Sequence, residues 1–314
     1  MNTLSSLQNL NHPLFTKHKV RVMIKRDDLL HPVISGNKWR KLKYNIEKVK
    51  ENSYQGIISF GGSYSNHIHA LAYACHLQQI RSLAIIRGEP EYADNFTLSQ
   101  ARAWGMELKF VDRKTYRLRH DKEFLNRVQA KYPKYFIVPE GGSNALALPG
   151  VGEIVSELDQ QCQFDTLMTP VGSGGTLAGL VVADKNRHQL LGVAALKQSD
   201  YLQTEVNRLL PSGHQYYNKW KILSDYHCGG YGRFNRQHSE QILSFIKETD
   251  VPFEPVYSGK MILALMDLVE KNYFPPGHKI VLLHTGGLQG LGGLAQRKLI
   301  RADEWPSPPV PPAR

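Results

Sequence analysis

Short apolar segments alternate with helical segments along most of the chain, and this alternation is the strongest constraint on its fold. The apolar segments are rich in β-branched or aromatic residues and end at Gly or a charged residue, which is typical of buried strands. They lie at residues 55–62, 82–88, 107–112, 135–142, 164–172, 190–196 and 278–287. Helical spacing of apolar residues falls between them, at residues 65–80, 96–105, 121–132, 151–161, 174–186, 236–250 and 258–272. The repetition predicts an α/β protein with a three-layer α/β/α architecture and mostly parallel sheets.

The strand–helix units form two sets, which predicts two domains with one sheet each. A chain of 314 residues is long enough for both. We expect a large domain built from residues 1–52 and 161–314, and a small α/β domain, residues 53–160, inserted into it. Residues 305–314 contain five prolines and are expected to form an extended, poorly ordered tail.

Composition and cysteine usage favour a protein of a reducing, cytoplasmic compartment. Apolar residues make up 41% of the chain, but no run of about 18 of them occurs, so no membrane span is expected. The N-terminal residues lack the basic region and continuous apolar stretch of a secretory signal. Cys75, Cys162 and Cys228 are far apart and form no CxxC pair, so neither a disulfide framework nor a metal site is predicted.

The chain carries a formal net charge of +11, which is compatible with nucleic acid, an anionic membrane or small anionic ligands as partners. Its basic residues are spread out and are not interleaved with aromatic residues as in single-strand binders. A basic surface with no nucleic-acid partner is therefore favoured. A nucleotide or nucleic-acid binder without a cofactor stays open as an alternative, for which strongly salt-dependent DNA binding would be the evidence.

Glycine-rich turns follow four of the predicted strands, at the edge where open α/β sheets bind ligands. They are residues 61–67, 140–144, 170–176 and 284–290. The turn PVGSGGT opens a helix and would point several backbone N–H groups at an anion. Glycines let this backbone approach a phosphate and two hydroxyls add donors; the residues are Gly172, Ser173, Gly174, Gly175 and Thr176. The turn lacks the Gly-Lys-Ser/Thr ending of a P-loop and the spacing of a dinucleotide fingerprint, so a monophosphate fits it best.

Lys38 follows Gly-Asn at the start of a basic helical segment, SGNKWRKLKYN. A lysine on a helix face is ordinarily a solvated charge, and we expect this of Lys41 and Lys43. Together with a monophosphate site, however, an isolated lysine after Gly-Asn suggests pyridoxal 5′-phosphate (PLP). This cofactor needs an amine, a phosphate site, and groups for its ring oxygen and ring nitrogen. Candidates for all four are present in the sequence.

Five motifs stand in the order GNKWRKL, GGSYSNH, GSGGT, PVYSGK and HTGG between residues 36 and 287. In this order they resemble the PLP-dependent β-family (fold type II). More narrowly, they resemble its group of 1-aminocyclopropane-1-carboxylate (ACC) deaminases and D-cysteine desulfhydrases. The resemblance spans most of the chain. It implies a PLP-dependent lyase or deaminase of amino-acid metabolism that acts on a small amino acid and forms a homodimer.

The resemblance implies catalytic and substrate-binding roles for residues of the first two motifs. Lys38 would form the Schiff base with PLP and remove the α-proton of the substrate. Asn66 would hydrogen-bond the ring oxygen O3′. Ser65 would bind the substrate carboxylate, together with backbone N–H groups near Asn66 and His67. For His67, a helix cap or a packing residue is an equally good interpretation.

The later motifs would hold the cofactor. The loop from Gly172 to Thr176 would bind the phosphate, and Ser258 and Thr285 would lie near the pyridine nitrogen. Tyr231 and Tyr257 match active-site tyrosines of the family. Core aromatic residues with satisfied hydroxyl groups are the alternative for both tyrosines.

The sequence departs from the family pattern at three positions. ACC deaminases have a glutamate, which faces the pyridine nitrogen, where this chain has Ser258. A hydroxyl does not keep that nitrogen protonated as a carboxylate does, so ring opening of ACC is disfavoured and β-elimination is favoured. Tyr64 replaces the usual Gln, and is expected either to narrow the substrate pocket or to pack. His69 stands where the group often has Arg.

The predicted reaction is therefore α,β-elimination and deamination of a small amino acid, D-cysteine first, with pyruvate, ammonia and sulfide as products. ACC ring opening and the turnover of another D- or β-substituted amino acid stay open. A PLP-binding protein without turnover would keep the same motifs and also stays open. The chirality of the substrate depends on which face of the cofactor Lys38 occupies, which the sequence does not give.

Overall fold

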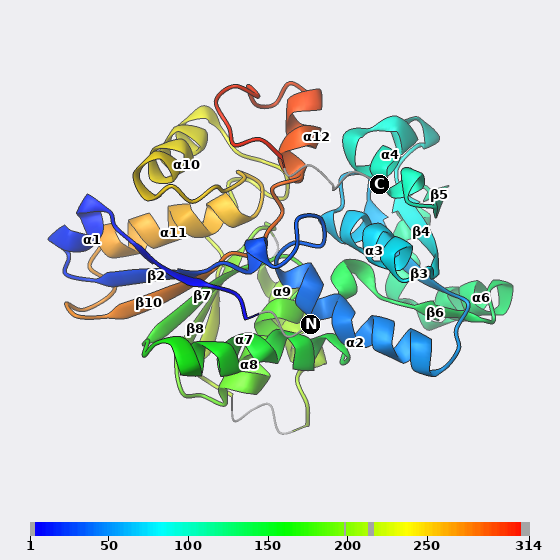
Figure 1. The fold of residues 1–314 in the computed structure, drawn as a ribbon, viewed down its shortest axis with the longest axis horizontal. Coiled ribbons are helices and arrows are strands. Elements are labelled where there is room, and N and C mark those ends of the chain that lie inside the picture. Colours follow the sequence, from blue (N-terminus) through cyan, green and yellow to red (C-terminus); the bar gives the residue numbers. More distant parts are fainter. Residues whose placement is uncertain (1–3, 198, 213–216, 309–314) are drawn as a thin grey trace.

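Two separate β-sheets organise the chain, which the computed structural model describes over residues 4–197, 199–212 and 217–308. Within these residues a six-stranded sheet has the order β1-β2-β10-β7-β8-β9, and a four-stranded sheet has the order β5-β4-β3-β6. Every strand pair is parallel except β1 with β2. The predicted α/β fold with mostly parallel sheets is confirmed (Figure 1).

The strands of the six-stranded sheet come from both ends of the chain. They are β1 (Leu7–Leu10), β2 (Arg21–Lys25), β7 (Thr166–Val171), β8 (Gln189–Ala194), β9 (Trp220–Leu223) and β10 (Lys279–Leu283). The four-stranded sheet uses consecutive strands, namely β3 (Gly56–Gly62), β4 (Arg81–Arg87), β5 (Met106–Val111) and β6 (Tyr135–Ile137). Every residue of β7 is buried, as expected of a parallel strand covered on both faces.

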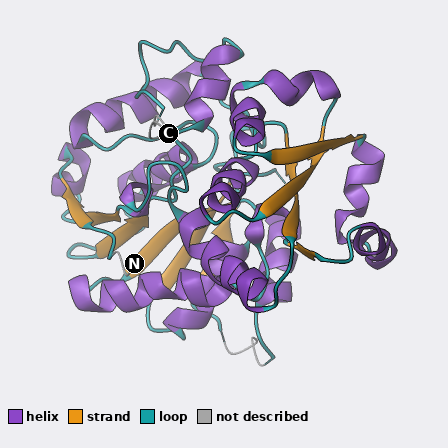
Figure 2. Cartoon of the chain, turned by 45° about the vertical axis from the view of Figure 1, so that its right-hand side comes forward, coloured by secondary structure: helices purple, strands orange, loops and turns teal. Residues whose placement is uncertain are grey.

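Helices cover both faces of the six-stranded sheet (Figure 2). One face packs against α1 (Pro13–Lys17), α10 (Arg236–Thr249), α11 (Ser258–Glu270) and α12 (Gly290–Gln296). The other face packs against α7 (Ala147–Gln161), α8 (Gly175–Asp184) and α9 (Ser199–Leu209). Among the described residues, no helix is long and apolar enough to cross a membrane. None of their His, Cys, Asp and Glu side chains form a group of three that could hold a metal ion.

The four-stranded sheet has its own two helical layers. One consists of α2 (Asn37–Glu51), α3 (Asn66–Leu77) and α4 (Phe96–Ala103). The other contains α5 (Arg113–Arg117) and α6 (Lys122–Lys131). Short 3₁₀ turns complete the structure, at η1 (Asp27–Leu29), η2 (Pro90–Asp94), η3 (Leu118–His120) and η4 (Glu140–Gly142).

The predicted domain limits, residues 53 and 160, do not coincide with the hydrophobic cores. Leu42 and Val49 of α2 are buried in the core of the small sheet, although α2 precedes residue 53. Ile154 and Leu158 of α7 are buried against the large sheet, although α7 lies almost entirely before residue 160. These two helices pack against each other, so each domain is completed by a helix that the sequence pattern assigned to the other.

The predicted tail needs a correction at its start. Trp305 is only 6% exposed and belongs to the core of the large sheet, because an aromatic ring gains more from burial than the flanking prolines cost. Residues 309–314 of the predicted tail lie outside the described residues. The strands β1, β2 and β9 and the helix α9 were not predicted. The three strands are only four or five residues long, and α9 is rich in polar residues.

A buried ionic cluster fixes the start of α2 between the two domains. The Arg40 guanidinium donates to Asp27 Oδ1 at 3.1 Å and to Glu157 Oε2 at 2.9 Å. Ser5 Oγ donates to Asp27 Oδ1 at 2.6 Å, and Lys25 Nζ lies 2.6 Å from Glu157 Oε2. Asp27 is fully buried and Arg40 is 3% exposed, so neither charge has water as an alternative partner. Asp27 thus serves in a structural ion pair with Arg40.

Replacing Arg40 should be far more costly than replacing an exposed neighbour on the same helix. We expect Arg40→Ala to lower the free energy of unfolding by about 3–5 kcal/mol, because it leaves the Asp27 carboxylate buried without its main partner. Lys43→Ala, which removes a pair with Glu153 at the surface, should cost no more than about 1 kcal/mol. Urea unfolding of both variants measures the difference. Equal losses would contradict the structural role of Arg40.

Candidate active site at the carboxyl ends of the strands

The glycine-rich turns of the two domains meet at the carboxyl ends of their strands. Asn66 begins α3 after the turn of β3, and its Nδ2 lies 2.9 Å from the position that a Cβ on Gly287 would take. Ser173, after β7, lies so close to Gly141 that a side chain there would overlap it. The site predicted from separate motifs is thus a single region to which both domains contribute.

The start of α2 is tied to this region at two points. Gly36 precedes the helix with φ = 64°, and a Cβ there would overlap the backbone carbonyl of Thr285. Only glycine therefore fits this position. Asn37 Nδ2 donates to Thr176 Oγ1 at 2.8 Å. This bond links the helix to the loop from Gly172 to Thr176, which we call the phosphate-type loop. Both residues of the Gly-Asn pair thus hold the next residue, Lys38, in place.

Lys38 is the second residue of α2, directly after this anchored pair. Its side chain is partly exposed, and desolvation by the surrounding protein lowers its pKa to about 8. Lys41, one helical turn later, and His67 lie close to each other, since the His67 ring and Lys41 Cβ both lie within 4 Å of the position that a Cβ on Gly142 would take. Desolvation, followed by the charge of Lys38, lowers the pKa values of Lys41 and His67. An amine with this pKa is neutral in a substantial fraction near neutral pH, as a nucleophile or a base requires.

Lys41 is the main residue that sequence reasoning missed. It was expected to be a solvated charge, but it is 1% exposed, and its Nζ donates to Ser143 Oγ at 2.7 Å and to Ser173 Oγ at 3.4 Å. Ser143 and Ser173 share a further hydrogen bond of 2.7 Å. Burial lowers the pKa of Lys41 well below its usual value, so a bound anion would stabilise its charged form. Its spacing, three residues after Lys38, was the available signal, because one helical turn puts both on the same face.

The phosphate-type loop has the geometry expected of an anion site. Gly174, with φ = 78°, is the N-cap of α8, and no side chain caps the helix there. A Cβ on Gly175 would lie 2.6 Å from Ser143 Oγ and 3.0 Å from Lys41 Nζ, so the loop approaches these donors closely. Backbone N–H groups, hydroxyl groups and an ammonium therefore surround one position at a helix N-terminus, which suits a phosphate.

Two residues of the SNH motif, Ser65 and His67, lie in different environments. Ser65 caps α3 by accepting a hydrogen bond from the Ile68 N–H at 3.3 Å, and remains partly exposed. His67 is buried, and its Nε2 is 2.8 Å from Ser59 Oγ, while Nδ1 has no hydrogen-bond partner among the described residues. Burial, followed by the charges of the neighbouring lysines, lowers the pKa of His67 well below its usual value. His67 is therefore a neutral imidazole with one ring nitrogen available.

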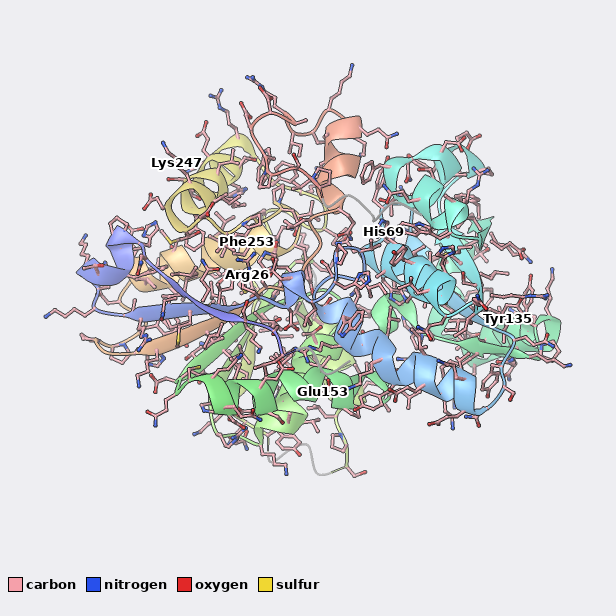
Figure 3. The ribbon with its side chains drawn as sticks, viewed as in Figure 1. Arg26, His69, Tyr135, Glu153, Lys247 and Phe253 are labelled. Carbon is pink, nitrogen blue, oxygen red and sulfur yellow. The ribbon has the colours of Figure 1, made fainter. Side chains whose placement is uncertain are left out.

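The side chains of Tyr64 and His69 make packing contacts. The Tyr64 ring lies 5.0 Å from the Arg297 guanidinium of the large domain and 6.3 Å from the Tyr92 ring of the small domain. Tyr64 thus contacts both domains. His69, labelled in Figure 3, is 2% exposed. Its Nε2 lies 2.8 Å from Gln100 Oε1 of α4, and the centre of its ring lies 4.9 Å from that of Trp104. Of the two roles expected for Tyr64, these contacts match packing.

The two tyrosines occupy different environments. Tyr257 Oη donates to the Pro170 carbonyl at 2.8 Å, just before the phosphate-type loop, so its proton is already engaged. Tyr231 is 53% exposed, yet desolvation, followed by the charge of Glu254, raises its pKa to about 12. Its loop is held by the buried Lys260, whose Nζ donates to the Gly230 carbonyl at 2.8 Å. Sequence reasoning missed this role of the PVYSGK lysine.

The two candidates for the pyridine nitrogen also differ. Ser258 is fully buried and its Oγ donates to Glu254 Oε1 at 3.0 Å. The Glu254 carboxylate accepts further bonds from the backbone N–H groups of Val256, Tyr257 and Ser258. Thr285 Oγ1 is buried without a partner among the described residues. Only the Thr285 hydroxyl of these two has a proton free to donate to a ligand.

One hollow elsewhere has no part in this site. A space of about 400 Å³ is lined by residues that include Cys162, Phe164, His188 and Lys279. Phe164 and Lys279 lie at the amino-terminal ends of β7 and β10, whereas the glycine-rich turns follow the carboxyl ends. The candidate site is thus at the opposite edge of the sheet.

Comparison with known proteins identifies the class. Residues 6–286 match the family described as pyridoxal-phosphate dependent enzymes, so the chain belongs to this family and uses PLP. The residues at the site fit the cofactor. The orphaned Thr285 hydroxyl can meet its ring nitrogen, and the loop around Gly175 with Lys41 can hold its phosphate.

Individual relatives narrow the resemblance. The chain is 30% identical over 284 residues to a Pyrococcus furiosus protein provisionally named a 1-aminocyclopropane-1-carboxylate deaminase, covering 86% of this chain and 85% of that one. It is 30% identical to the mitochondrial bifunctional D-cysteine desulfhydrase/1-aminocyclopropane-1-carboxylate deaminase of Arabidopsis thaliana, covering 85% and 72% of the two chains. A crystal structure of an ACC deaminase homologue superimposes with a TM-score of 0.81 at 25% identity, over 95% of this chain and 93% of that one.

The pKa of Lys38 predicts how the cofactor-free protein takes up PLP. Schiff-base formation needs the neutral amine, so the rate should rise about tenfold per pH unit below pH 8 and level off above it. A lysine at the ordinary value of 10.5 would keep accelerating through pH 9 and 10. Absorbance of the bound cofactor after mixing at each pH gives the profile. Continued acceleration above pH 9 would contradict a desolvated Lys38.

Lys41 is expected to contribute to cofactor affinity. Lys41→Met keeps the length of the side chain but removes the ammonium, and should weaken PLP binding by about 10- to 100-fold, the range for one or two charge-assisted hydrogen bonds. Titration of the cofactor-free protein with PLP measures the dissociation constant. Lys43→Ala, on the same helix but pairing with Glu153, is the matched control and should bind PLP as the unmodified protein does.

Proposed function

We propose that this enzyme catalyses α,β-elimination and deamination of a small amino acid, D-cysteine first, with release of pyruvate, ammonia and sulfide. The observation that carries the proposal is the placement of Lys38. Its amine has a pKa lowered to about 8, and its helix is tied both to the phosphate-type loop through Asn37 and to Thr285 through Gly36. The amine of Lys38, the anion site of the phosphate-type loop and the hydroxyl of Thr285 thus belong to one region.

The roles of the chain's own residues follow from this arrangement. PLP, when bound, supplies an electron sink for negative charge at the substrate Cα. Lys38 takes the proton from Cα, since a desolvated amine is a base that can accept and return a proton near neutral pH. Ser65 and the backbone N–H groups at the start of α3 hold the substrate carboxylate. Asn66, beside Gly287, reaches the ring oxygen.

The remaining polar groups position the substrate and its leaving group. Tyr231 is exposed and carries a hydroxyl whose pKa is raised, so it is protonated near neutral pH and suits donation to a departing group. Tyr257, which is hydrogen-bonded to Pro170, suits a supporting role beside the phosphate loop. His67 offers a neutral Nδ1 as a hydrogen-bond partner for the substrate.

The surroundings of the ring nitrogen favour elimination over ring opening. Thr285 can donate a hydrogen bond to an unprotonated pyridine nitrogen, and Ser258 already donates its proton to Glu254. A hydroxyl donor leaves the ring a weaker electron sink than a carboxylate partner would. Elimination of a thiolate tolerates the weaker sink, because the leaving group carries the charge away. ACC has no comparable leaving group.

ACC deamination is the second candidate function, and the names of the relatives support it. The bifunctional Arabidopsis relative carries both activities in its name. The buried carboxylate of Glu254, which contacts Ser258, is the feature of this chain that would favour ACC, if it shifts the ring toward its protonated form.

We also propose a cytoplasmic homodimer. The three cysteines are free, as in a reducing compartment, and Cys75 is buried in α3. Burial raises the pKa of the Cys75 thiol, which makes it unreactive. The homodimer follows from the family resemblance.

Pyruvate release from D-cysteine tests the proposal. The purified protein should be yellow and release pyruvate and sulfide from D-cysteine, with little or no ammonia from ACC. Lys38→Ala should abolish both colour and turnover, whereas the control Lys43→Ala should keep them. A yellow protein that prefers ACC would replace the proposed reaction with ring opening. Retained turnover in Lys38→Ala would refute the role of Lys38, and absence of turnover on any amino acid would favour a PLP-binding protein without catalysis.

A further inference from the structure

A cluster of arginines lines a second hollow, in the small domain. The space has a volume of about 370 Å³ and is lined by Arg87, Arg113, Tyr116, Arg117 and Arg119, which we call the arginine pocket. Arg87 is the last residue of β4, and the others belong to α5 and η3. The lining therefore combines four guanidinium groups with one aromatic ring.

A buried network holds part of the arginine pocket in place. Tyr116 is 2% exposed and its Oη donates to Glu140 Oε1 at 2.8 Å. Arg119 Nε donates to the other oxygen of Glu140 at 2.5 Å. The guanidinium groups of Arg87 and Arg119 lie 5.5 Å and 5.0 Å from the centre of the Tyr116 ring. Cation–π contact with Tyr116 thus positions Arg87 and Arg119 before any ligand arrives, and the pair with Glu140 holds Arg119 further.

The charges of the arginine pocket are poorly balanced. Glu140 pairs with Arg119. Across the residues that the structure describes, no carboxylate lies within ion-pair distance of Arg87, Arg113 or Arg117. Four guanidinium groups around one hollow repel one another, and an anion with several oxygens would relieve this repulsion. Arginine presents paired N–H donors that match phosphate and carboxylate groups.

The arginine pocket adjoins the candidate active site. Arg87 pairs in register with Gly62, which belongs to the GGSYSNH turn, and its Nη2 lies 3.5 Å from where a Cβ on Gly62 would be. A ligand in the hollow would therefore lie beside the GGSYSNH turn, which carries Ser65 and Asn66.

We propose that the arginine pocket is a binding site for a phosphate or a comparable multiply charged oxyanion. The ligand chemistry is shared by two sources, namely an anionic group on the side chain of the amino-acid substrate and a free anion that binds beside it. The existence of the site is independent of the proposed reaction. Only the identification of its source rests on that function.

Calorimetric titration of the PLP-loaded enzyme with inorganic phosphate tests the site. Bound PLP already fills the phosphate-type loop, so the titration reports other sites. We expect one phosphate per chain, and Arg113→Ala/Arg117→Ala should weaken binding by about tenfold or more per lost arginine. The control Arg236→Ala/Arg301→Ala removes the same charge from exposed positions of the large domain and should bind phosphate normally. Absence of binding, or equal weakening in both double variants, would overturn the proposal.

A second arm separates the two sources, with O-phospho-D-serine and D-serine as substrates. β-Elimination from O-phospho-D-serine removes the Cα proton, breaks the Cβ–O bond and releases phosphate, and water then converts the remaining enamine into pyruvate and ammonia. If the site receives the substrate's own phosphate, Arg113→Ala/Arg117→Ala should raise the KM for O-phospho-D-serine at least about tenfold more than that for D-serine. If the ligand is a separate anion, free phosphate should change the turnover of D-serine itself. Loss of phosphate binding with neither kinetic effect would overturn a site coupled to the active site. If the enzyme turns over neither substrate, the calorimetric arm still decides whether the site exists.

Discussion

The ionic cluster of Arg40, Asp27 and Glu157 is the interaction on which the arrangement of the active site depends. Arg40 stands two residues after Lys38 on α2, and its partners come from η1 and from α7. Because α2 lies in the core of the small domain while α7 lies in that of the large one, the cluster fixes how the two domains meet. Buried charges lose far more on separation than exposed ones, so the junction resists small displacements.

The chemical properties of Lys38 follow from this junction. The start of α2 is held by the close approach of the Gly36 backbone to the Thr285 carbonyl and by the Asn37–Thr176 hydrogen bond. The surrounding protein desolvates the amine and lowers its pKa to about 8. The same helix turns Lys41 into the phosphate-type loop, where burial would be unfavourable without an anion. One helix thus carries both the proposed nucleophile, Lys38, and the proposed phosphate ligand, Lys41.

The sequence alone predicted the parallel α/β fold and the glycine-rich turns, because buried strands and turn glycines leave periodic, local signals. It assigned α2 to the large domain and α7 to the small one, whereas α2 packs in the core of the small domain and α7 in that of the large one. Which apolar faces meet in three dimensions decides this, and the sequence pattern does not show it. Lys41 and Lys260 were missed for a related reason. The sequence does not distinguish a solvated lysine from a buried one. The hydrogen bonds of Lys41 to Ser143 and of Lys260 to the Gly230 carbonyl, which only the structure shows, reveal the roles of these two lysines. Trp305 was assigned to a disordered tail because prolines dominate its segment.

Covalent attachment of the cofactor tests the central claim most directly. The PLP-loaded enzyme would be reduced with borohydride, digested and mapped by mass spectrometry to locate the modified lysine. The structure predicts a single modification at Lys38. Modification at Lys41 or Lys260, two other lysines that are buried, or no modification at all, would contradict the role of Lys38.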